Sequence, residues 1–69
     1  MLMEVVTVTS REIIKRLKAD GWHEVGQVGS HKKFKHPTKS GAVTVKHPAQ
    51  DYPPKTLRSM ESQSGIKLR

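Results

Sequence analysis

Cysteine is absent from the 69 residues, which excludes a disulfide scaffold, a cysteine nucleophile and a cysteine-based metal site. The absence also fits a reducing cytosol. No apolar run approaches the roughly 20 residues that cross a membrane. Residues 1–8 contain Glu4 and lack the basic start of a secretion signal. We therefore expect a cytoplasmic protein that does not interact with membranes.

Acidic residues are few: the chain has six Asp and Glu against thirteen Lys and Arg, which gives a net charge of +7. In a chain this short, such a charge favours a polyanionic partner. Nucleic acid is the first candidate and a strongly acidic protein is the second. The length allows one domain at most, with a core that supplies only roughly 3–5 kcal/mol of stability.

Several catalytic motifs are also missing. The chain has no phosphate-binding glycine loop and no acidic pair for two-metal catalysis. Three histidines could reach a metal from adjacent strands, but no cysteine or carboxylate cluster accompanies them: His31, His36 and His47. We therefore expect neither a metal nor a cofactor.

The segment 9–20 has the pattern of an amphipathic helix. Thr9 and Glu12 form a capping-box pattern at its start, with Ser10 as the competing N-cap. Apolar side chains recur at helical spacing on one face: Ile13, Ile14 and Leu17. Gly21 stands where a left-handed C-cap ends such a helix.

Three short strands are expected next, over Trp22–Val28, His31–His36 and Ala42–Lys46. Gly29-Ser30 forms the first turn, and the run 37–41 is dense in turn-forming residues. Alternation along the second strand places Phe34 toward the core. It places His31, Lys33 and Lys35 together on the opposite face.

A second helix is expected over Lys55–Ser64, with a proline in its first turn and Gly65 ending it. Leu57 and Met60 are expected to face inward from this helix, and Ile66 is expected to close the core after it. The order of helix, three antiparallel strands and helix is an α+β arrangement, which double-stranded RNA-binding domains share. We assign residues 9–69 to this domain and residues 1–8 to an N-terminal extension.

An ordered set of short motifs then carries a family resemblance. Its members are Ser10-Arg11-Glu12-Ile13-Ile14, Gly21-Trp22, Gly29-Ser30-His31, His36-Pro37, Val43-Thr44-Val45 and Pro53-Pro54-Lys55-Thr56-Leu57-Arg58-Ser59. No single motif is specific, but the set in this order resembles the HicA family of mRNA interferase toxins from about residue 10 to residue 66. Gly26 departs from the family, many of whose members carry a basic residue near this point.

The resemblance implies a small fold like that of double-stranded RNA-binding domains. It implies a toxin of a type II toxin–antitoxin pair that cleaves mRNA as an endoribonuclease. The histidine of the Gly-Ser-His motif, His31, is then the catalytic residue. The implied protein partner is a HicB-like antitoxin that covers this site.

The residues themselves suit this chemistry. RNA supplies its own nucleophile in the 2′-hydroxyl, and a histidine moves protons well near neutral pH. A Gly29-Ser30 turn can bring backbone N–H groups to a phosphate, and lysines stabilise its developing charge. We therefore expect these residues to bind RNA: Gly29, Ser30, Lys33, Lys35 and Lys46.

Some roles stay open at this level. The second proton-transfer group could be His36, His47, a lysine, the substrate or water, although turn geometry also explains both His-Pro pairs. Trp22 could stack on a base, but its place after the C-cap glycine favours core packing. We expect His23 to face solvent.

Two other functions fit the same charge and element order. The first is a non-catalytic RNA-binding module, whose affinity would fall steeply with salt. The second is an interaction protein whose basic face only holds an acidic partner. Loss of cleavage in His31→Ala would separate the enzyme from both.

Overall fold

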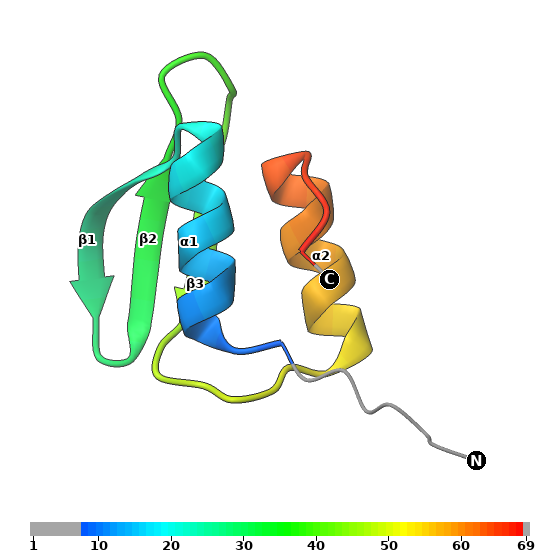
Figure 1. The fold of residues 1–69 in the computed structure, drawn as a ribbon. Helices are drawn as coiled ribbons and strands as arrows, with labels where there is room; N and C mark the ends of the chain where they lie inside the picture. The colour runs from blue at the N-terminus through cyan, green and yellow to red at the C-terminus, as the bar shows by residue number, and fades with distance from the viewer. Residues whose placement is uncertain (1–7, 69) are drawn as a thin grey trace.

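The computed structural model describes residues 8–68 (Figure 1). Its elements are α1 (Ser10–Asp20), β1 (His23–Val28), β2 (His31–Lys35), β3 (Val43–Lys46) and α2 (Pro54–Ser64). This order confirms the expected α+β fold. Of the expected N-terminal extension, residues 1–7 lie outside the described part. No helix among residues 8–68 is long and apolar enough to cross a membrane.

Both helices begin and end where the sequence signals stand. The Thr9 side chain accepts from the Glu12 N–H at 3.2 Å, and Gly21 adopts φ +107°, the left-handed C-cap. Helix α2 begins at Pro54, a position where the missing proline N–H costs no hydrogen bond. It ends before Gly65, which is also left-handed.

The three strands form one antiparallel sheet in the order β1-β2-β3. Both helices pack on the same side of the sheet, against β3 (Figure 1). Strand β1 extends beyond the helices and has no buried residue. The helices therefore cover one face of the sheet at β2 and β3, and the other face of the sheet is open to solvent.

The core lies between the helices and the covered face of the sheet. Its most deeply buried apolar residues are Ile13, Leu17, Trp22, Phe34, Val43, Val45 and Leu68. The expected inward residues Leu57 and Met60 also belong to it, whereas Ile66 is only half-buried at its border. Val8, which the sequence groups with the N-terminal extension, is buried in the same core.

Candidate functional site

His31 is the first residue of β2 and directly follows the two-residue turn that joins it to β1. Gly29 adopts φ +59° in this turn, and glycine at the first central position is the pattern of a type II′ hairpin. Gln27 Nε2 donates a hydrogen bond to the Gly29 carbonyl at 2.8 Å. The turn thereby sets the point at which His31 enters the sheet.

The solvent-open face of the sheet, here called the outer face, carries His31, Lys33, Lys35, Thr44 and Lys46 on β2 and β3. On β1 it carries Val28, Gly26 and His23, which pair with His31, Lys33 and Lys35. All eight residues are exposed. His31 is flanked across the strands by Val28 on one side and Lys46 on the other, while Lys33 stands opposite Thr44. The structure thus brings together His31 and the three lysines expected to bind RNA.

Within the described part of the chain, the lysines of the outer face have no partner of opposite charge. Among residues 8–68, the lysines in ion pairs are Lys32, at 3.1 Å from Glu24, and Lys39, at 2.6 Å from Asp20. Neither belongs to the outer face. Lys33, Lys35 and Lys46 therefore leave a positive potential around His31 that an anion can neutralise.

Tyr52 supports Lys46 from the covered side. Its hydroxyl donates to the Lys46 carbonyl at 2.7 Å, and its side chain is buried. Burial raises the pKa of the Tyr52 phenol further above neutral pH, where the group is protonated and donates. The sequence left Tyr52 without a role, because nothing local connects the loop after β3 to this carbonyl.

His36 has a structural role at the far end of β2. Its Nδ1 accepts the Thr38 and Lys39 N–H groups at 3.1 and 3.2 Å, so the ring proton sits on Nε2. Nε2 then donates to the Asp20 carbonyl at 2.7 Å, and the ring packs edge-on against Trp22 at 5.2 Å. The expected turn role of His36-Pro37 is confirmed.

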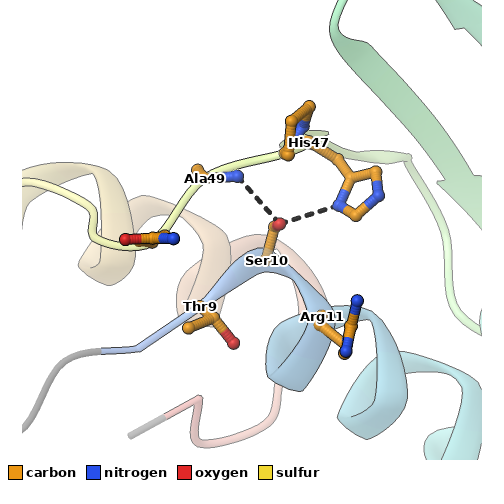
Figure 2. A pocket seen from close by; sticks show the side chains of 7 residues that line it. Thr9, Ser10, Arg11, His47 and Ala49 are labelled. Carbon is orange, nitrogen blue, oxygen red and sulfur yellow. Dashed lines mark hydrogen bonds between the residues drawn. The ribbon is translucent and has the colours of Figure 1, made fainter.

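His47 also bonds to a group on the helix side of the sheet. Its Nδ1 is 2.7 Å from the buried Ser10 hydroxyl, which also accepts the Ala49 N–H at 3.0 Å (Figure 2). The His47 backbone N–H donates to the Ser30 carbonyl at 2.7 Å. Ser10 and His47 are 37 residues apart, so no local signal in the sequence marks their contact.

A pocket of about 330 Å³ surrounds this contact at the start of α1. Its lining residues are Thr9, Ser10, Arg11, His47, Pro48, Ala49 and Gln50. His31 and the outer-face lysines do not line it. The pocket and the outer face are therefore separate features of the molecule.

These positions narrow the choice of residues that can act beside His31. His36 and His47 bond to groups on the helix side of the sheet, which leaves the lysines as the titratable side chains nearest His31 on its own face. Trp22 is 1% exposed and is a core residue, so it offers no surface on which a base can stack. His23 is exposed, as expected, and pairs in register with Lys35.

Residues 10–66 match the family described as the HicA toxin of bacterial toxin–antitoxin systems. A search among curated proteins finds no match.

Solved structures of two toxin–antitoxin complexes are similar to the chain. A HicA3 and HicB3 complex has a TM-score of 0.76 at 32% identity, covering 88% of this chain and 98% of that one. A complex from Streptococcus pneumoniae has a TM-score of 0.71 at 30% identity, covering 86% and 98%. The fold is thus that of a toxin from a bacterial toxin–antitoxin system. The chain belongs to the HicA toxin family.

Proposed function

We propose that this toxin is an endoribonuclease that cleaves mRNA in the cytoplasm by metal-independent acid–base catalysis, with His31 as the catalytic residue. The observation that carries the proposal is the placement of an exposed histidine between Val28 and Lys46, on a face whose lysines have no carboxylate partner among residues 8–68. A phosphodiester on this face would meet a proton-transfer group and uncompensated positive charge together.

The reaction needs no group beyond the RNA and the protein. The 2′-oxygen attacks the adjacent phosphorus, the O2′–P bond forms and the P–O5′ bond breaks. A base takes the 2′-hydroxyl proton, and the leaving 5′-oxygen gains a proton. The products are a 2′,3′-cyclic phosphate and a 5′-hydroxyl. His31 performs one of these transfers.

The lysines hold the substrate and stabilise the phosphorane. Lys46 is nearest in register to His31 across the β2–β3 pair, and Tyr52 holds its backbone in place. Lys33 and Lys35 continue the row along β2, where they contact phosphates on one side of the cleavage point. The Gly29-Ser30 turn contributes backbone N–H groups to the same backbone of RNA.

The protein partner is a HicB-like antitoxin that covers the outer face. The solved structures similar to this chain are toxin–antitoxin complexes. A net charge of +7 favours an antitoxin with acidic residues opposite the lysines. Binding there would block His31 and exclude RNA at the same time.

Cleavage of a long unpaired RNA in the presence of EDTA tests the proposal. The wild-type protein is compared with His31→Ala and with His23→Ala, which removes an exposed imidazole from the same sheet. We expect products with cyclic phosphate ends from the wild type and His23→Ala only. Circular dichroism verifies that all three proteins are folded.

A non-catalytic RNA-binding module is the second candidate, because the unpaired lysines alone suffice for phosphate binding. In that case all three proteins bind RNA equally and none yields product. Wild-type cleavage that stops with EDTA would instead contradict the metal-independent mechanism.

A further inference from the structure

The two sides of His31 on the outer face are chemically different. Lys46 stands on the β3 side, whereas Val28 stands on the β1 side. Val28 is 82% exposed, far more than the other exposed apolar residue of the strand, Val25. The Val28 methyl groups are an apolar contact point beside the proposed catalytic group, which a flat, weakly polar part of a ligand can cover.

Gly26 adds open space beside Val28. It pairs in register with Lys33 and follows the irregularity in the β1–β2 ladder at Val25. A Cβ added at Gly26 would have no protein atom within 4 Å beyond its chain neighbours, and the φ of Gly26 is not in the left-handed range. Next to His31 and Lys33, the β1 side of the outer face is therefore both flat and uncharged.

We propose that Gly26 and Val28 form a nucleobase-contacting subsite, which receives the base of the nucleotide whose 2′-hydroxyl is attacked. This inference rests on the proposed ribonuclease function, and it gives the orientation of the RNA on the outer face. The phosphate lies toward Lys46 and Lys33, the ribose lies over His31, and the base lies over Gly26 against the Val28 methyl groups.

The position of the cations supports this orientation. A nucleotide has an anionic end and a flat, weakly polar end, and the outer face offers matching halves on either side of His31. Neighbouring strands are about 4.8 Å apart, so Val28 and Lys46 flank His31 within the span of one nucleotide. A base can lie flat on this surface only when it is unpaired, so the subsite favours single-stranded RNA.

A protein contact fits the same surface less well. Apolar docking patches on proteins cover several hundred Å². Here a single apolar side chain stands among histidine, lysines and a glycine on the outer face. A single nucleobase can cover one such side chain, whereas a protein docking patch needs more apolar area.

An oligodeoxynucleotide with one ribonucleotide tests the subsite, since its only 2′-hydroxyl fixes the cleavage point. One version carries a base on that ribose and the other is abasic. We expect the wild type to cleave the version with the base about fivefold faster in kcat/KM, from partial burial of one valine side chain. Val28→Ser loses this preference because it slows cleavage of that version only.

Val25→Ser is the matched control, because Val25 is the other exposed valine of β1 and does not pair with His31. It should retain the wild-type preference. The open space accepts a Cβ at Gly26, so Gly26→Val should fill the space and lower cleavage of the base-containing version about fivefold or more. Equal rates for wild type, Val28→Ser and Gly26→Val would overturn the subsite.

Binding separates this inference from the proposed function. Oligonucleotides with a 2′-deoxy residue at the same point cannot be cleaved, and fluorescence anisotropy measures their Kd with and without the base. A base preference that depends on Val28, without cleavage of any RNA, would refute the ribonuclease and retain the subsite. If Val28→Ser changes neither rate nor Kd but weakens antitoxin binding, the surface is a protein contact and the inference is wrong.

Discussion

Replacing Lys33 with glutamine removes one positive charge from the outer face and keeps most of the side chain. Lys32→Gln is the matched control on the neighbouring residue. Lys32 lies on the other side of the strand and bonds to Glu24 at 3.1 Å and to Gln27 at 3.3 Å. Both variants lower the net charge by one, so only the position of the charge differs between them.

The salt dependence of RNA binding reports the number of phosphates that lysines contact. For single strands, log K falls with log salt by roughly 0.7 per phosphate neutralised. If Lys33, Lys35 and Lys46 each contact one phosphate, a fourfold rise in salt weakens binding about 18-fold in the wild type. The same rise weakens Lys33→Gln only about 7-fold, whereas Lys32→Gln keeps the wild-type slope.

Fluorescence anisotropy with a non-cleavable 2′-deoxy oligonucleotide over a salt series measures these slopes. The reasoning is refuted if the two variants change the slope equally, because binding then responds to net charge rather than to the outer face. It is also refuted if neither variant changes it.

Three further predictions concern the scaffold of the site. Phe34→Ala removes a fully buried ring and should lower the free energy of unfolding by about 3–5 kcal/mol. This is the whole stability expected of a core this small, so a urea titration should start from mostly unfolded protein. A loss of unfolding free energy below about 1 kcal/mol would contradict the core assignment. Gly29→Ala should cost about 1–2 kcal/mol in the same assay because of the left-handed φ, whereas Gly26→Ala should cost much less. The Lys39 ammonium is the main cause that lowers the pKa of Asp20 below its usual 3.8, so this carboxylate stabilises the fold above that pH and its contribution disappears as pH falls through the lower, folded-state pKa. Asp20→Asn should therefore lower the Tm at pH 7 and differ less from wild type below pH 3.8; a difference independent of pH would contradict this role.

Local patterns predicted the elements that frame the site. The capping box at Thr9 and Glu12 and the glycine at position 21 set the ends of α1 to within one residue. Alternation along β2 correctly separated Phe34 from His31, because side chains of a strand point to opposite faces in turn.

Local patterns could not predict contacts between segments that are distant in the sequence. Leu68 is fully buried although it follows the end of α2, where no helical or strand period marks an inward position. Ser10 meets His47 only because the loop after β3 wraps the start of α1. The choice of a second proton-transfer group depended on these contacts, which is why the sequence left His36 and His47 open.

The rate of RNA cleavage by His31→Ala, relative to wild type and His23→Ala, tests the central claim most directly. A well-placed proton-transfer group contributes roughly 10²–10⁴-fold, so His31→Ala should lose activity by about that factor with EDTA present. His23→Ala should stay within about twofold, since it removes a solvent-facing ring that pairs with Lys35 and not with His31. Cleavage by folded His31→Ala at the wild-type rate would contradict the assignment of His31 as the catalytic residue.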